Sequence, residues 1–328
     1  MKIILVGNPY NLFKHTPAEE WTQQITFSHY PNGIFNKEEI KNDLDAKILV
    51  ADPMVKVTGN IISSLPNLRL IQSEGVAFDQ IEIAVAQELK IPVCNCKGVN
   101  ASAVAEQAIL LMLGLLRSVI AGDIAVRSGR QGQMKKESAI HGIKELSECN
   151  VGLVGFGDIA RATAERLNAF GCKVFCYNHH IIPIEILNKY NVQQVGLQEL
   201  ARICDIVSIH VPVTPETTNM INSKFFNNMK NDALIINTAR GEIIDALALR
   251  EAIVNGRIAG AGLDTINPEP VTIDNPLLNL PPEASKKILF SPHIGGITNG
   301  SLLRGDELIW KNIKLILEGK TPLNCIKR

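Results

Sequence analysis

The segment VGLVGFGDIARATAERLNAFGCKVFCYN, residues 151–178, constrains the fold more than any other part of the sequence. It has the pattern of an apolar strand, a tight glycine turn, a helix, a glycine that ends the helix, and a second apolar strand. A unit of this kind joins two parallel strands. Parallel strands are buried on both faces, so the segment predicts an α/β fold whose sheets are covered by helices.

Short β-type runs alternate with helical patterns on both sides of this unit. Before it, the predicted strands are Lys2–Val6, Lys47–Ala51, Leu68–Gln72 and Ile91–Cys94, and the predicted helices are Lys37–Leu44 and Ile81–Leu89. From Val151 onward, the predicted strands are Val151–Gly155, Lys173–Tyr177, Asp205–Val211, Ala233–Asn237, Gly260–Leu263 and Ile288–Phe290. Two such series predict two doubly wound parallel sheets.

A long apolar helix at Asn100–Arg117 separates the two series, and a final helix is expected at Ser301–Glu318. The segments Gly98–Asn100 and Pro292–Gly300 have the character of hinges on either side of the second series.

The length of 328 residues also favours two domains. We therefore expect a domain made of residues 1–100 plus 298–328, with a second domain, residues 101–297, inserted into it. Ligands of open α/β sheets bind beyond the carboxyl ends of the strands, so the residues that follow each strand are the candidates for function.

The composition excludes several classes of protein. With 46% apolar residues the chain can form a sizeable core, which excludes a disordered chain. The 33 basic and 33 acidic residues cancel, so neither a nucleic-acid partner nor a membrane partner is expected. The N-terminal apolar run is too short for a signal peptide, and the longest apolar stretch, Ala108–Leu116, is about half a membrane span. The sequence predicts a cytoplasmic protein.

The seven cysteines form no obvious disulfide framework. Only Cys94 and Cys96 are close in sequence, and no second close pair completes a zinc site. We therefore expect no metal site, and buried free thiols in a reducing compartment.

The glycine turn predicts a dinucleotide site. Gly155 and Gly157 would allow a sharp turn and a close approach of the backbone to a pyrophosphate. The helix that begins at Asp158 and Ile159 would offer free N–H groups and the positive end of its dipole. Ala160 replaces the usual third glycine, which is an accepted variant.

The end of the second strand departs from the usual pattern. Asn178 stands where an acidic residue would normally bind the ribose 2′-hydroxyl group, 21 residues after Gly157. An asparagine can bond a hydroxyl without repelling a 2′-phosphate. His179 and His180 follow, either as plain surface residues or close to such a phosphate, and no Arg or Lys is adjacent. The cofactor is therefore NAD or NADP.

Three polar residues that follow strands form a candidate catalytic set: Arg240, Glu269 and His293. An arginine can bind a carboxylate and polarise a carbonyl, and a histidine can exchange a proton with a hydroxyl group. A carboxylate bonded to that histidine would orient it. Hydride transfer between a nicotinamide and a 2-oxo acid requires these groups. Taken singly, Arg240 could instead pair with Asp245, and the other two could be ordinary loop residues.

Several long motifs, in the right order, resemble the D-isomer-specific 2-hydroxyacid dehydrogenase family nearly from end to end. They are GVNASAVAEQAILLML, VGLVGFGDIARATAERLNAFG, SIHVPVTPETTNMIN, LIINTARGEIID, AGAGLDTINPEP and SPHIGG. The resemblance implies a Rossmann-type cofactor domain inserted into a flavodoxin-like substrate domain. It also implies a homodimer.

The resemblance assigns roles to particular residues. Arg240 would bind the substrate carboxylate and carbonyl, while His293 and Glu269 would form the proton relay. The backbone of Val76 and Ala77 would receive the substrate carboxylate. The residues expected to line the dinucleotide are Gly155, Gly157, Asp158, Ile159, Asn178, Pro212, Thr217, Thr238, Ala239, Gly295 and Asp264, the last holding the nicotinamide carboxamide.

Three positions depart from the family pattern. Ala77 replaces a glycine of the substrate loop, and Asn178 replaces the usual aspartate. The stretch Ser128–Ile140 lacks a tryptophan that many relatives carry in a segment that commonly reaches a partner subunit.

The predicted function is hydride transfer between NAD(P)H and a small 2-oxo acid, giving the D-2-hydroxy acid, and the reverse. The alternatives are a cofactor-sensing, corepressor-like binding protein and a dehydrogenase of another small anion such as phosphite. No cluster of Arg or Lys lies near Val76, and we expect no appended regulatory domain of the kind some phosphoglycerate enzymes carry. The expected substrates are therefore unphosphorylated acids such as glyoxylate, hydroxypyruvate or pyruvate.

Overall fold

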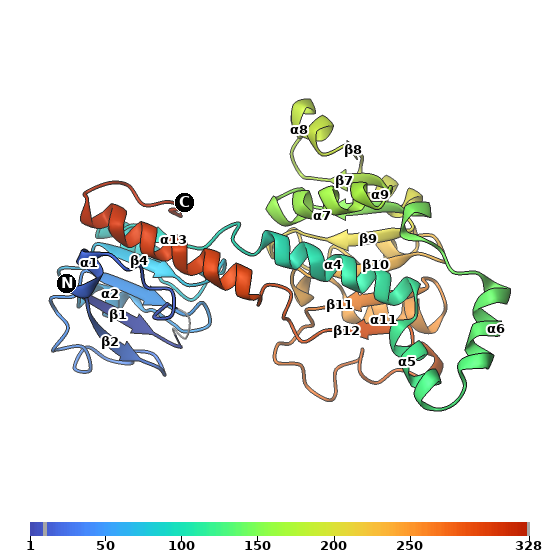
Figure 1. Ribbon diagram of the computed structural model, residues 1–328, viewed down its shortest axis with the longest axis horizontal. Helices are drawn as coiled ribbons and strands as arrows, with labels where there is room; N and C mark the ends of the chain where they lie inside the picture. Colours follow the sequence, from blue (N-terminus) through green and yellow to red (C-terminus); the bar gives the residue numbers. More distant parts are fainter. Residues whose placement is uncertain (9–11, 327–328) are drawn as a thin grey trace. The chain divides into compact units, whose positions relative to one another are not determined.

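The computed structural model describes residues 1–8 and 12–326. The chain forms two compact units, Met1–Asn100 with Thr298–Arg328, and Ala101–Ile297. Each unit contains one parallel sheet with helices on its faces (Figure 1). The α/β fold predicted from the sequence is confirmed.

The first unit contains a 5-stranded sheet in the order β2-β1-β3-β4-β5, which is the flavodoxin-like order. Its strands are β1 (Lys2–Val6), β2 (Thr26–Tyr30), β3 (Ile48–Ala51), β4 (Leu70–Ser73) and β5 (Val93–Cys94). Its helices are α1 (Glu20–Gln23), α2 (Gly59–Ser63), α3 (Ile83–Glu88) and α13 (Asn299–Leu317).

Two apolar layers enclose this sheet. Figure 1 shows α13 lying along one face, where Trp310 and Ile313 pack against Ile3 of β1. On the other face, α2 and α3 pack on Ile4 and neighbouring strand residues. Adjacent residues of β1 therefore point into different cores, as a strand buried on both faces requires.

The second unit contains a 7-stranded sheet in the order β12-β11-β10-β9-β6-β7-β8. Its strands are β6 (Asn150–Val154), β7 (Lys173–Tyr177), β8 (Val192–Gln194), β9 (Ile206–Ile209), β10 (Leu234–Asn237), β11 (Gly260–Leu263) and β12 (Ile288–Phe290). The chain reverses its direction of winding between β6 and β9, which is the switch point where doubly wound sheets bind ligands.

Helices cover both faces of the second sheet. Leu234 and Ile236 of β10 face the core shared with α4 and α7, whereas Ile235 faces α11. The helices are α4 (Ala101–Leu116), α5 (Val119–Arg127), α6 (Gln131–His141), α7 (Asp158–Ala169), α8 (Ile184–Lys189), α9 (Leu197–Ile203), α10 (Ser223–Phe226), α11 (Ala246–Val254) and α12 (Pro282–Ser285), with short 3-10 turns at Leu146–Glu148 and Gly241–Ile243.

Among the described residues, no single helix has the length and apolar character needed to cross a membrane. Only α4 and α5 taken together meet that test, across a bend of 54°.

One local prediction was wrong, and two strands were not predicted. The predicted helix Lys37–Leu44 is a series of turns, in which the carboxylate of Asp43 accepts hydrogen bonds from the hydroxyls of Ser28 and Tyr30 on β2. These tertiary bonds compete with the helix that local propensity favours. Strands β2 and β8 were missed, because both lie at sheet edges and β2 is only partly buried.

Glycine in β11 sets how closely α4 packs on the sheet. A Cβ atom at Gly262 would lie 2.9 Å from Cβ of Leu111 and 3.1 Å from Cδ1 of Ile236. The first of these atoms is fixed to the backbone of α4 and cannot rotate away. The glycines of the AGAGL motif therefore allow direct helix–sheet contact.

We expect Gly262→Ala to lower the free energy of unfolding by about 1–3 kcal/mol, because it overpacks this contact. Urea denaturation of the purified protein measures the change. Gly305→Ala in the interior of helix α13 is the matched control, since an added Cβ there meets no atom within 4 Å. The control should be as stable as the wild type or slightly more so. Equal stability of the two variants would contradict the packing argument.

Candidate functional site

Most of the residues singled out in the second unit lie just beyond the carboxyl ends of its parallel strands. Gly155 follows β6, Asn178 follows β7, Thr238 follows β10 and Asp264 follows β11. Because all these strands are parallel, the residues share one edge of the sheet. This edge includes the switch point between β6 and β9.

The glycine turn after β6 is shaped by the neighbouring strand. Gly155 has a φ of +95°, and a Cβ atom there would lie 2.7 Å from the carbonyl oxygen of His210, the residue that follows β9. Only glycine meets both conditions without strain. At Gly157, in contrast, an added Cβ meets no atom within 4 Å. A side chain there would fill open space in front of the helix rather than clash with the protein.

The N-terminus of α7 presents backbone donors to that space. Gly157 is the N-cap residue, and no side chain caps the first turn, which begins at Asp158 and Ile159. Nearby in the same set of loops, the buried hydroxyl of Thr238 has no hydrogen-bond partner within the described residues. Uncapped amides and an unpaired hydroxyl fit a ligand that brings oxygen acceptors, such as a pyrophosphate.

The end of β7 carries no basic side chain of lysine or arginine. Asn178 Nδ2 donates to the carbonyl oxygen of His180 (3.0 Å), and the exposed imidazoles of His179 and His180 stack edge to face. The hydrogen bond between Glu216 and Thr214 is the main cause that lowers the pKa of the Glu216 carboxyl. The nearby imidazole of His179 lowers this pKa further.

The loop after β9 is held by its own side chains. Thr217 Oγ1 donates to the carbonyl oxygen of Pro212 (2.7 Å) and accepts from the backbone N–H of Thr214 (2.7 Å). The structure therefore brings Pro212 and Thr217 together, and it uses the hydroxyl of Thr217 to fix the loop.

Arg240 sits in a turn organised by Asn237. Asn237 Nδ2 donates to the carbonyl oxygen of Arg240 (2.8 Å), and its Oδ1 accepts from the N–H of Ala239 (3.0 Å). Arg240 itself is half-buried, and its Nη1 donates to the carbonyl of Ala239. Asp245 caps α11 through the N–H groups of residues 247 and 248 and makes no ion pair with Arg240 in the described part of the chain.

Gly241 brings the Arg240 turn against the loop that follows β11. A Cβ atom at Gly241 would lie 2.3 Å from the backbone nitrogen of Asn267 and 2.4 Å from the carbonyl carbon of Ile266. These contacts are with backbone atoms, so the two loops approach each other only because residue 241 is glycine. The second loop continues to Glu269, and Asn275 Nδ2 fastens it by donating to the carbonyl oxygen of Asn267 (2.9 Å).

His293 and Glu269 form a direct pair. His293 Nδ1 lies 2.5 Å from Oε1 of Glu269, and the two side chains are 38% and 44% exposed. His293 has a φ of +56°, a left-handed conformation that non-glycine residues adopt only where the surroundings impose it. The bond to Nδ1 leaves Nε2 available to another molecule, and a histidine–carboxylate pair of this kind can transfer a proton.

Asp264 holds the backbone that carries His293. Its buried carboxylate accepts from Ser291 Oγ (2.6 Å), the N–H of Ile294 (3.2 Å) and the N–H of Gly295 (3.0 Å). Ser291 Oγ in turn accepts from Gln107 Nε2 of α4 (2.8 Å). Gln107 and Ser291 were not among the residues predicted from the sequence. The available signal was a polar residue within the apolar pattern of α4.

The first unit contains the two remaining residues, Val76 and Ala77, in the loop after β4. The carbonyl oxygen of Val76 accepts from Asn95 Nδ2 (2.7 Å), and that of Ala77 accepts from Ser73 Oγ (2.6 Å). Their backbone N–H groups donate to no acceptor within residues 1–8 and 12–326. The carbonyl groups of this loop are bonded to side chains of the protein and its N–H groups are free, so the loop can bind an anion.

Acidic side chains lie close to Glu74, which is in the same loop. Burial raises the pKa of the Glu74 carboxyl to about 8, and the nearby carboxylates of Asp52 and Asp306 add to the shift. Asp306 is itself bonded to His15 (2.5 Å). Across the described residues, no group of three or more side chains is placed to bind a metal ion.

Known proteins provide an independent comparison. The sequence model described as "D-isomer specific 2-hydroxyacid dehydrogenase, NAD binding domain" matches residues 109–295. A hydroxypyruvate reductase from Thermotoga maritima is 35% identical over 93% of this chain and 98% of its own length. A glyoxylate reductase from Thermofilum pendens is 34% identical over 87% of this chain and 83% of its own length. The solved structure of the TT0316 protein from Thermus thermophilus matches with a TM-score of 0.82 and 27% identity, covering 100% of both chains.

We expect Asp264→Asn to loosen the loop that carries His293, because an amide nitrogen would replace one of the two acceptor oxygens. Leaving one of these buried N–H or O–H donors unpaired should lower the stability of the loop by about 1–3 kcal/mol. Hydrogen exchange of the backbone amides of Ile294 and Gly295 measures it directly. Ser291→Ala, which removes one donor and leaves the carboxylate in place, should have a smaller effect. Unchanged protection of both amides in Asp264→Asn would contradict this role.

Proposed function

This chain belongs to the D-isomer-specific 2-hydroxyacid dehydrogenase family, and we propose that its substrates are short, unphosphorylated 2-oxo acids. Members of the family are oxidoreductases that transfer a hydride between a nicotinamide cofactor and a small 2-oxo or 2-hydroxy acid, and this chain is one of them. The observation that carries the proposal is the His293–Glu269 pair at the ligand-binding edge of the matched domain.

In this proposal the unit Ala101–Ile297 binds the cofactor. The backbone at Gly155 and Gly157 and the first turn of α7 would hold the pyrophosphate of the cofactor. The residues proposed to line the rest of the cofactor are Asn178, Pro212, Thr217, Thr238, Ala239, Asp264 and Gly295. The unit Met1–Asn100 with Thr298–Arg328 supplies the amides of Val76 and Ala77 to the substrate carboxylate.

Two side chains act on the substrate in the proposed mechanism, and a third acts through one of them. The guanidinium of Arg240 polarises the carbonyl group. Protonated His293 donates from Nε2 to the carbonyl oxygen, since Nδ1 is engaged with Glu269. Glu269 orients the imidazole through its hydrogen bond to Nδ1. When bound, the nicotinamide supplies the hydride or accepts it. In the oxidation direction, neutral His293 takes the hydroxyl proton.

The surroundings of the substrate loop favour an unphosphorylated acid. Glu74, Asp52 and Asp306 are close enough to one another for the two aspartates to raise the pKa of Glu74. A substrate phosphate beside the carboxylates of Asp52 and Asp306 would meet like charge, which destabilises binding. Glyoxylate and hydroxypyruvate, which name the activities of the two similar reductases, have no phosphate.

We also propose that NADPH is accepted as well as NADH. Asn178 is neutral and makes its own hydrogen bond to the carbonyl of His180, so it does not repel a 2′-phosphate. The imidazoles of His179 and His180 are exposed beside it and can offer donors to a phosphate.

The helices α5 and α6 are the proposed dimer contact. Exposed apolar side chains gather on them, and α6 has no buried residue. The large ones on or beside these helices are Val119, Ile120, Ile124, Val126, Ile140 and Ile143. Such a concentration is typical of a surface that another protein covers. A second copy of the chain is the proposed occupant.

Mixing the protein with NADH or NADPH and a panel of 2-oxo acids, and following the nicotinamide absorbance, tests the function. We expect turnover of glyoxylate, hydroxypyruvate or pyruvate. His293→Gln should lower kcat by about 10²–10⁴-fold, the usual contribution of a general acid, with cofactor affinity nearly unchanged. Wild-type turnover in this variant would contradict the proton-donor role. Cofactor binding without turnover of any acid would favour a binding protein, and phosphite-dependent reduction of NAD or NADP would favour the other anion.

Asn178→Asp tests the cofactor proposal. A carboxylate at the end of β7 would repel the 2′-phosphate, so kcat/KM for NADPH should fall by about tenfold or more while that for NADH is kept or improved. Asn255→Asp, an exposed position after α11, makes the same change in charge away from the site and should leave both values unchanged. If Asn178→Asp left the ratio of the two kcat/KM values unaltered, Asn178 would not face the 2′-position.

A further inference from the structure

Cys94 and Cys325 face each other at one edge of the first sheet. Cys94 lies in the edge strand β5, and Cys325 forms an antiparallel bridge with it. Two backbone hydrogen bonds of 3.3 Å and 2.8 Å flank the bridge, each joining the residue after one cysteine to the residue before the other. The cysteines are therefore a non-hydrogen-bonded pair, in which opposed Cα atoms lie about 4.5 Å apart.

The two sulfur atoms are 3.3 Å apart. A disulfide needs a separation of about 2.05 Å between its sulfurs and of roughly 4.4–6.8 Å between its Cα atoms. A non-hydrogen-bonded pair meets the second condition, so closing the sulfurs by about 1.3 Å requires little backbone movement. In the other unit, Cys149 Sγ donates to the carbonyl oxygen of Glu145 (3.5 Å), and Cys172 Sγ donates to that of Leu146 (3.1 Å).

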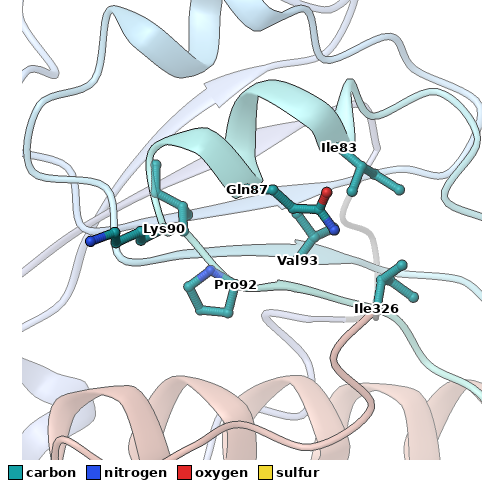
Figure 2. Close-up of a pocket in the computed structure, with 7 residues that line it drawn as sticks. Ile83, Gln87, Lys90, Pro92, Val93 and Ile326 are labelled. Carbon is teal, nitrogen blue, oxygen red and sulfur yellow. The ribbon is translucent and has the colours of Figure 1, made fainter. Parts of the chain in front are cut away.

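Polar contacts attach the segment around Cys325 to the rest of its unit. Asn312 of α13 bonds both the N–H (2.7 Å) and the carbonyl (3.1 Å) of Leu323. On the other side, Val93 and Ile326 line a cavity of about 280 Å³ together with residues of α3 (Figure 2). Cys325 and Ile326 also pack against the two cores of this unit, so hydrogen bonds and apolar contacts together hold the segment at the sheet edge, next to the cavity.

The two thiols differ in access to reagents. Cys325 is partly exposed, whereas Cys94 is fully buried. Burial raises the pKa of the Cys94 thiol, and the neighbouring Cys325 raises it further. A soluble oxidant therefore meets Cys325 first, and Cys94 is the thiol placed to react with the product.

We propose that Cys94 and Cys325 form an oxidation site, at which a peroxide joins them in a reversible disulfide that fastens the C-terminal segment to β5. Cys325 sulfur attacks hydrogen peroxide, the O–O bond breaks, and a sulfenic acid and one water form. Cys94 sulfur then attacks the sulfenic sulfur and expels its oxygen as a second water, which carries the proton of Cys94. In sum, two thiols are oxidised to a disulfide and one peroxide is reduced to two waters.

This inference does not depend on the proposed function, because it uses no residue of the cofactor or substrate site. The bond would close a ring of chain that includes the whole unit Ala101–Ile297. Such a long closed loop constrains the unfolded chain, so the oxidised protein should unfold at a higher temperature.

The test is to treat the reduced protein with a small excess of hydrogen peroxide and to analyse it by intact mass and non-reducing peptide mapping. We expect a loss of about 2 Da, one linked peptide joining Cys94 to Cys325, a Tm raised by several degrees, and full reversal by dithiothreitol. Unlinked Cys94 and Cys325 peptides after oxidation, or a link between other cysteines, would overturn the proposal.

Two variants separate the steps. In Cys94→Ala the sulfenic acid of Cys325 should persist and be trapped by dimedone, whereas the wild type should give little adduct. Cys325→Ala should give neither the link nor the adduct. Cys149→Ala, in the other unit, is the matched control and should form the link as the wild type does. A dimedone adduct of equal yield in wild type and Cys94→Ala would show that Cys94 does not resolve it. The wild-type peptide map decides the proposal even if a variant fails to fold.

Discussion

The buried carboxylate of Asp264 determines the geometry of the candidate active site. It accepts three hydrogen bonds from the loop after β12, and it directly follows β11, the strand next to β12 in the sheet. A buried carboxylate is costly unless such donors satisfy it, so the loop and the carboxylate stabilise each other. The left-handed backbone of His293 is held by these bonds, and its side chain thereby reaches Glu269.

Glycines bring the neighbouring loops to the same edge. Gly155 allows the turn after β6 to pass close to the backbone of His210, and Gly241 allows the Arg240 turn to touch the loop that leads to Glu269. In both cases the contact is with backbone atoms, which cannot move aside. Gly157 is different, because it leaves open space in front of α7. Two of these glycines therefore serve packing, and the third keeps open the space in which we propose that the cofactor binds.

The sequence predicted the sheets well because most of their strands are short, nearly continuous apolar runs that are buried on both faces. All strands of the second sheet except β8 were predicted, and the first sheet lacked only β2. Both missed strands are edge strands, where half-exposed residues give no clear period. The wrong helix at Lys37–Leu44 shows the same limit, since the hydrogen bonds of Asp43 to β2 are formed by residues distant in sequence.

By itself, the sequence determined the α/β class, the strand–turn–helix unit at the glycine turn, and the set of polar residues that follow strands. The strands and helices follow from local hydrophobic periodicity. The turn follows from glycines at positions whose backbone conformation other residues rarely adopt. Only the tertiary structure decided which of these residues meet. The bond between His293 and Glu269, the support of Asp264 by Ser291 and Gln107, and the contact of Cys94 with Cys325 all join segments far apart in the chain. Such contacts follow from how strands are ordered in a sheet, and hydrophobic periodicity does not encode that order.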